Sequence, residues 1–130
     1  MNAWVADIEQ ATLDNTNFRT VLWTGEHTQL TVMRIGAGED IGLEAHPDHD
    51  QFIRIEQGKA RVELGPTEDE VEEMHEVEDD WAIIVPAGVW HNVVNTGDGD
   101  LKVYSLYSPP EHPPNTAHAT KADAMAAEHA

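Results

Sequence analysis

The sequence predicts an all-β fold, either a sandwich or a barrel, and a jelly roll suits its size. Three observations lead to this prediction. About eight to ten short segments are apolar or rich in β-branched residues, as strands are. Turns rich in Gly and Pro separate these segments. The 130 residues, 40% of them hydrophobic, suffice for one domain with a single core.

The first half of the chain is expected to contain two pairs of strands. The first pair, residues 18–23 and 30–35, brackets a turn at Thr24-Gly25-Glu26, and a loop follows it. The second pair, residues 51–56 and 59–64, brackets Gln57-Gly58 and is expected to form a hairpin.

In the second half, residues 81–85 and 101–107 are expected to be strands. Residues 71–77 can form a strand or a short helix, because their apolar residues are spaced by three, and this alternative stays open. We expect residues 1–108 to form the barrel. Residues 109–130 are expected to be a proline-rich connector and a short helical tail, capped by Thr120 or Asp123.

The composition excludes several classes of function. A net charge of −18 disfavours nucleic acids and anionic membranes as partners. Nine of the 13 residues from Glu68 to Asp80 are acidic, which is typical of a solvated loop or edge hairpin, with a cation-attracting lip as the alternative. The excess of acid also suits a salt-rich cytoplasm, in which case stability should rise towards molar salt. The first ten residues lack a basic and apolar leader, and no apolar run is long enough for a membrane, so we expect a cytoplasmic protein.

The segment from Pro86 to Asn95 carries the clearest chemical pattern, PxGxxHxxxN. Its proline and glycine predict a tight turn after a buried strand, and His91 follows at a fixed distance on the next strand. Such a turn directs one imidazole, which would form one side of a metal site. Because the chain has no cysteine, other ligands must be nitrogen or oxygen donors, which points to Fe, Mn, Ni, Co, Zn or Cu.

Three further polar residues are spaced to complete such a site. Glu44 and His46 lie two apart, so in an extended strand they share a face. Gln51 shares a face with isoleucines that are expected in the core, so its amide needs a partner there. His49 lies in the turn between them, and it is the alternative ligand in place of Glu44 or Gln51.

These spacings resemble the two motifs of the cupin superfamily, G(x)5HxH(x)3-4E(x)6G and G(x)5PxG(x)2H(x)3N. The second motif, at about 80–95, matches except that Asp80 occupies the leading glycine position. In the first, at about 42–58, Glu44 takes the place of the first histidine and Gln51 that of the glutamate, while Gly58 keeps its interval. The resemblance covers roughly residues 28 to 108 and implies a double-stranded β-helix. Some small cupins that process sugars and uronates also have Gln at the glutamate position.

The resemblance implies one divalent metal ion per chain, held by Glu44, His46, Gln51 and His91. The expected function is Lewis-acid catalysis on a small oxygenated substrate, such as isomerisation or ring opening of a sugar or uronate. Glu44 or His49, whichever is not a ligand, is the candidate proton acceptor. The alternatives are a cupin-type dioxygenase and a non-catalytic metal- or ligand-binding barrel. Small cupins usually pair, so we also expect a homodimer.

Other polar and aromatic residues are expected to be structural. Trp90 should face away from the site, and Arg54 and Arg61 should face solvent and pair with acids, or else bind a substrate carboxylate. The remaining histidines are expected at the surface or in the proline-rich connector: His27, His75, His112, His118 and His129.

Overall fold

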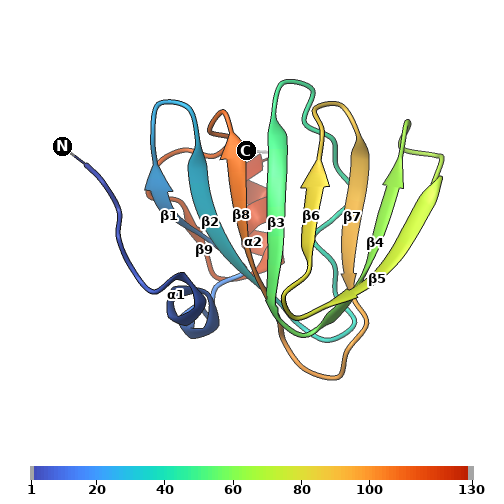
Figure 1. The fold of residues 1–130 in the computed structure, drawn as a ribbon, viewed down its shortest axis with the longest axis horizontal. Coiled ribbons are helices and arrows are strands. Elements are labelled where there is room, and N and C mark those ends of the chain that lie inside the picture. Colours follow the sequence, from blue (N-terminus) through green and yellow to red (C-terminus); the bar gives the residue numbers. More distant parts are fainter. Residues whose placement is uncertain (1, 129–130) are drawn as a thin grey trace.

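The computed structural model describes residues 2–128, which form two antiparallel sheets (Figure 1). The larger sheet has the order β6 (Ala82–Val85), β3 (Asp50–Gln57), β8 (Leu101–Ser108), β2 (Gln29–Ile35), β1 (Arg19–Thr24) and β9 (Ala117–His118). The smaller sheet has the order β5 (Glu73–Glu78), β4 (Lys59–Gly65) and β7 (Trp90–Asn95). Two isolated bridges, Asp40 to Val94 and Glu44 to His91, place residues 40–44 beside β7.

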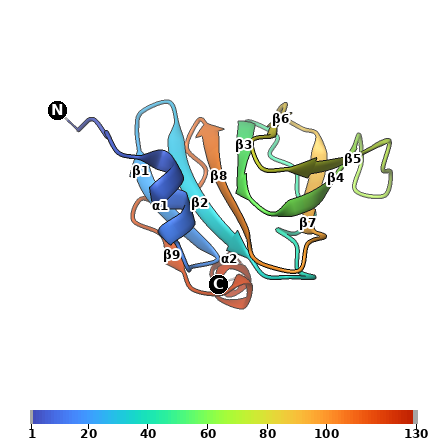
Figure 2. The same cartoon turned by 60° about the horizontal axis from the view of Figure 1, so that its bottom comes forward.

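The predicted all-β fold with a C-terminal helix is confirmed. Figure 2 shows the strands curving round to enclose an interior, with α2 (Lys121–Glu128) at one end. Within residues 2–128 no helix is both long enough and apolar enough to cross a membrane. The open question about residues 71–77 is settled by pairing: β5 is a strand because it forms a six-residue ladder with β4. It is an exposed edge strand, so the acidic segment is solvated as expected.

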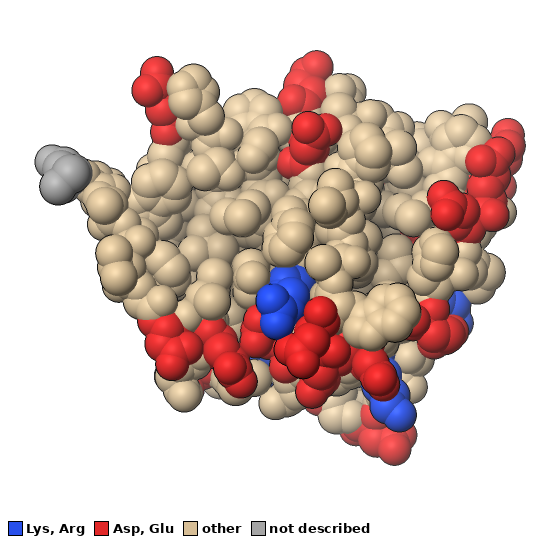
Figure 3. Space-filling view, in the orientation of Figure 1, with Lys and Arg blue, Asp and Glu red and all other residues tan. Residues whose placement is uncertain are grey.

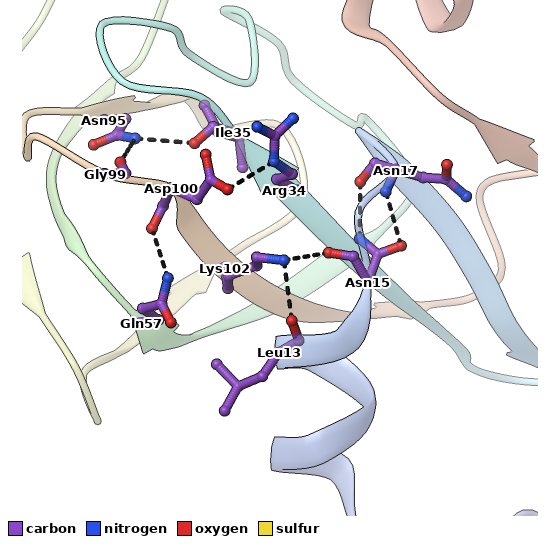
Figure 4. Close-up of polar contacts among 10 residues, drawn as sticks. All are labelled: Leu13, Asn15, Asn17, Arg34, Ile35, Gln57, Asn95, Gly99, Asp100 and Lys102. Atoms are coloured by element: carbon purple, nitrogen blue, oxygen red, sulfur yellow. Dashed lines mark hydrogen bonds and ion pairs between the residues drawn. The ribbon is translucent and has the colours of Figure 1, made fainter.

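Helix α1 (Ile8–Asp14) was not predicted, because seven residues carry too little periodic signal. Its first turn is capped by Asp7, whose carboxylate accepts from the amide of Gln10 over 3.1 Å. At its other end the ammonium of Lys102, on β8, donates to the carbonyls of Leu13 and Asn15 (Figure 4). A contact from the sheet therefore stabilises this helix.

The second motif is a structural turn as well as a candidate site. The side-chain amide of Asn95 donates to the backbone carbonyls of Ile35 and Gly99 over 2.9 and 2.8 Å. It therefore joins the ends of β7 and β2 (Figure 4). Asp80, in the motif's glycine position, has a φ of 74°. This is the left-handed region that glycine favours and Asp tolerates, which explains the residue types found there.

The interior changes from apolar to polar along the barrel. Strand register places buried side chains in rows across β2, β8 and β3. The successive rows are Met33, Val103 and Ile55, then Thr31, Ser105 and Ile53, then Gln29, Tyr107 and Gln51. The apolar end is the hydrophobic core, and the polar end is where the candidate ligands enter.

The connector after β8 returns across this polar end. The buried Gln29 side chain accepts from the amides of Glu111 and His112 over 3.1 and 2.9 Å and donates to the His112 carbonyl over 2.7 Å. Strand β9 then pairs with β1, and α2 follows with Thr120 as its cap, since Thr120 Oγ1 accepts from the amide of Asp123.

Candidate metal centre

Glu44 and His91 are held side by side by backbone pairing. The amide of Glu44 donates to the carbonyl of His91 over 3.0 Å, and the amide of His91 donates to the carbonyl of Glu44 over 2.9 Å. Directly opposed residues of an antiparallel pair carry their side chains on one face. Both side chains therefore enter the interior from the smaller sheet.

His46 and Gln51 enter from the neighbouring segments. The carbonyl of His46 accepts from the amide of Gly88 over 2.9 Å, which ties it to the turn of the second motif. Gln51 lies on β3, is 2% exposed and shares its buried face with Ile53 and Ile55, as its spacing predicts. Its amide nitrogen faces the hydroxyl of Ser105 at 3.4 Å, so its oxygen is directed to the histidines.

The donor atoms of these residues surround a common point. Glu44 Oε1 lies 3.3 Å from His46 Nε2 and 3.5 Å from His91 Nε2. Gln51 Oε1 lies 3.1 Å from His91 Nε2. The ligand atoms of Glu44, His46 and His91 are all within 4.8 Å of one another. Donors bound at about 2.1 Å to one ion stand roughly 3–4 Å apart, so the cluster suits a single ion.

Without a metal ion, the electrostatics of the cluster favour an ionised Glu44 and a protonated His46, whose proton a bound metal ion would displace. Burial alone would raise the pKa of Glu44, but hydrogen bonds and positive charge from His46 and His91 outweigh it and lower the pKa to about 2. Burial alone would lower the pKa of His46, but the nearby carboxylates of Glu111 and Glu44 raise the pKa to about 9. The carboxylate is thus ionised and attracts a cation.

The residues present fit a divalent ion. His46 Nε2 is buried and makes no hydrogen bond of good geometry. His91 has an oxygen at each ring nitrogen, the Val89 carbonyl 3.1 Å from Nδ1 and Gln51 Oε1 3.1 Å from Nε2. A neutral imidazole donates through one nitrogen only. If Nδ1 donates to Val89, Nε2 offers its lone pair towards Gln51 and Glu44, an arrangement that a metal ion at that point would satisfy.

His49 lies beside the cluster rather than within it. Its Nε2 is 3.2 Å from Glu111 Oε2 and 3.1 Å from the Pro110 carbonyl, and its ring centre is 6.0 Å from that of His46. Glu111, which sequence reasoning missed, therefore contacts both histidines, since its Oε1 is 3.5 Å from His46 Nδ1. Hydrogen bonding to His46 lowers the pKa of Glu111. A lone acid in a proline-rich connector gives no local signal of this contact.

The expectation that His112 lies in a surface connector is wrong. Its ring packs edge-on against Tyr107 at 5.1 Å between centres, because Gln29 holds the connector against the barrel. Burial, followed by the positive charge of Arg19, lowers the pKa of His112 to about 4.

His27 and His75 are exposed, as expected. His118 was expected in a surface connector but is partly buried on β9, which pairs with β1. Arg54 pairs with Asp80 and Arg61 lies near Glu63. Trp90 is half-buried on the face opposite to His91. His129 lies outside the described residues.

Comparison with known proteins places this chain among the cupins. The family model of the cupin domain matches residues 31–107. The uncharacterized protein YrkC of Bacillus subtilis is 58% identical over 125 residues, which are 96% of this chain and 67% of that protein. The crystal structure of BH2720 from Bacillus halodurans superposes with a TM-score of 0.95 at 54% identity, covering 96% of this chain and 95% of that one.

A more distant structure supports the fold alone. KdgF from Halomonas sp. is 22% identical, with a TM-score of 0.63 over 72% of this chain and 80% of that one. Three observations indicate the same family: the two antiparallel sheets, the motif turn that carries His91, and the family match over most of the barrel. The chain therefore belongs to the cupin family.

Proposed function

We propose that this protein is a mononuclear divalent-metal cupin that acts on a small oxygenated organic substrate. The observation that carries the proposal is the convergence of Glu44, His46, Gln51 and His91 on one point, with the buried Nε2 of His46 lacking a hydrogen bond. Two imidazoles, one carboxylate and one amide oxygen suit a first-row ion such as Fe, Mn, Ni, Co, Zn or Cu.

The chemistry that such an ion supplies is Lewis-acid polarisation of a carbonyl or enol oxygen. The four donors would hold it with one negative charge, so a divalent ion keeps a net positive charge. Because Glu44 is within 3.5 Å of both imidazoles, its best role is that of ligand.

Proton transfer would then fall to His49. Its Nε2 faces Glu111, and its Nδ1 is buried without a hydrogen bond. A histidine paired with a carboxylate can accept a proton and return it, which is the step that isomerisation or ring opening of a sugar or uronate needs. Of the two candidate proton acceptors, the geometry favours His49 over Glu44.

The decisive experiment is the metal content of untagged native protein, measured by elemental analysis. We expect close to one divalent ion per chain, and a His91→Ala variant purified in parallel should carry less than a tenth of that. Native protein without a metal, or full occupancy in His91→Ala, would contradict the metal site.

The reaction class is tested separately with the metal-loaded protein. Isomerisation or ring opening of sugars and uronates is followed by proton NMR, and oxygen consumption is measured with flavonol and diketone substrates. Turnover without oxygen uptake supports the Lewis-acid proposal. Oxygen uptake instead indicates a dioxygenase, and tight substrate binding without turnover indicates a non-catalytic barrel.

A further inference from the structure

Gln51 is a candidate ligand whose side-chain amide has two ends of similar shape and different chemistry. Its Oε1 has lone pairs that can bind a cation, whereas its NH2 group only donates hydrogen bonds. A carboxylate offers an oxygen whichever way it turns, but an amide must be oriented. Because packing alone does not distinguish ends of the same shape, hydrogen bonds must orient this buried amide.

Ser105 lies one row deeper in the barrel than Gln51, on the neighbouring strand β8. Its side chain is 1% exposed, and its Oγ faces Gln51 Nε2 at 3.4 Å. Gln51 Oε1 is on the other side of the amide and lies 3.1 Å from His91 Nε2. The hydroxyl therefore accepts from the NH2 group while the amide oxygen faces the donor cluster.

A reversed amide would find acceptors at the donor cluster itself. Glu44 Oε1 is 3.5 Å from His91 Nε2, the same atom that Gln51 Oε1 contacts. An NH2 group turned to that side would donate to this carboxylate or to the imidazole lone pair, and it would obstruct an ion there. Without an acceptor deeper in the barrel the reversed orientation is favoured, because a buried donor left unpaired is costly.

Thr31 gives the Ser105 hydroxyl a second neighbour, which allows it to act as an acceptor towards Gln51. Thr31 is directly opposite Ser105 on β2, on the side away from β3, and it is fully buried. Its Oγ1 makes no hydrogen bond. The Cβ atoms of such opposed residues are about 5 Å apart, so rotation of either side chain brings the two hydroxyls within hydrogen-bonding distance. The Ser105 hydrogen then has an acceptor that is not Gln51.

We propose that Ser105 is a positioning residue, which keeps the oxygen of Gln51 turned towards the bound ion. This inference rests on the proposed function, since Ser105 acts only through an amide that is itself a ligand. It also explains how a glutamine can serve at the glutamate position of the first motif: the orientation that a carboxylate does not need is supplied by β8.

The test measures the Co(II) affinity of the full chain by competition with a chelator of known affinity. Ser105→Ala should bind Co(II) at least tenfold more weakly than the wild type, with one ion per chain at saturation. Ser105→Thr keeps the hydroxyl and should stay within threefold of the wild type. Val103→Ala is the matched control, because it shortens a buried side chain on the same face of β8. It should lower stability and leave Co(II) affinity unchanged.

A double-mutant cycle determines whether Ser105 acts through Gln51. Gln51→Leu removes the amide and should itself weaken Co(II) binding at least tenfold. Adding Ser105→Ala to Gln51→Leu should change the affinity by less than twofold, because no amide is left to orient. A general structural role of Ser105 would instead give the same loss in both backgrounds.

The outcomes separate the two proposals. Unchanged affinity in Ser105→Ala, or equal losses from Ser105→Ala with and without the Gln51 amide, would overturn this inference and leave the proposed function intact. Unchanged affinity in Gln51→Leu would overturn it as well, since the amide would then not be a ligand. A wild-type protein that binds no Co(II) would overturn the proposed function, and this inference with it.

Discussion

The imidazole of His46 lies between two carboxylates, Glu44 at Nε2 and Glu111 at Nδ1. In metal sites a second carboxylate at the far nitrogen fixes the tautomer and the orientation of a ligating histidine. Glu44 therefore contacts one ring nitrogen of His46 from the barrel, and Glu111 contacts the other ring nitrogen from the connector.

The clearest test at this scale is removal of individual imidazoles. His46→Ala and His91→Ala should each abolish binding of one equivalent of Co(II), because each removes a donor that lies within 3.5 Å of Glu44. His49→Ala should retain binding within about tenfold, since His49 faces Glu111 instead. Titration followed by visible absorption measures all three. Loss of the site in His49→Ala would make His49 a ligand.

Glu111→Gln tests the positioning of His46. The amide cannot accept from His46 Nδ1 with the strength of a carboxylate, so metal affinity should fall about 10- to 100-fold without loss of stoichiometry. Competition with a chelator of known affinity gives the change. Glu26→Gln, at an exposed site, is the control. Equal affinity in Glu111→Gln and the wild type would show that the contact does not support the site.

His112 should make stability depend on pH. Its folded pKa of about 4 lies below its usual value of 6.5, so the unfolded chain binds the extra proton between these values. Its contribution is present above pH 6.5 and is lost as the pH falls to about 4, with about 2 kcal/mol lost by pH 5. Urea unfolding at pH 7 and pH 5 should therefore show a smaller loss in His112→Gln than in the wild type. Identical losses would contradict the shift.

The connector and helix α2 pack against the barrel and form part of its fold. Gln29 on β2 anchors residues 111–112, β9 pairs with β1, and Ala124 of α2 is 2% exposed within the core. One buried amide side chain therefore determines where Glu111 and His112 lie.

Gln29→Leu should release this anchor. Two partly buried backbone amides, those of Glu111 and His112, would lose their acceptor, at a cost of about 2–4 kcal/mol in unfolding free energy. Urea denaturation measures this cost. Gln57→Leu is the matched control, because Gln57 is exposed and makes one bond to the Asp100 carbonyl, and it should cost less than about 0.5 kcal/mol. Comparable losses in both variants would argue against a special role for Gln29.

Over the whole molecule, charge is distributed unevenly. Figure 3 shows acidic side chains along the lower rim and at the end over β5, while the middle of that face carries few charges. On the larger sheet, Leu106, Phe52 and Ile84 stand directly opposite one another across β8, β3 and β6. Phe52 and Leu106 are half-buried and Ile84 is 71% exposed.

We expect this face to pair with a second copy, because two chains of net charge −18 can approach closely only where both lack acids. Light scattering after size exclusion should give a dimer for the wild type and a monomer for Ile84→Asp. Val5→Asp, at a residue 95% exposed elsewhere, should remain dimeric. A monomeric wild type, or a dimeric Ile84→Asp, would contradict this interface.

Much of the barrel and of the donor set was predictable from local pattern. The side-chain period of two places Glu44 with His46 and Gln51 with Ile53, and the PxGxxH turn directs His91 whatever lies elsewhere in the chain. These relations hold over a few residues, so the order of the chain determines them. Asp80 also adopts the positive φ of a turn position where glycine is usual.

The surroundings of these candidate ligands depend on contacts between distant parts of the chain. Glu111 reaches His46 because its backbone amide bonds to Gln29, 82 residues earlier. Arg19, Glu44 and Met125 line one cavity because α2 packs against the barrel. The periodicity of the sequence does not predict such contacts, because they depend on which distant parts of the chain pack against each other. Local backbone geometry therefore determined which candidate ligands share a face, and long-range packing determined what surrounds them.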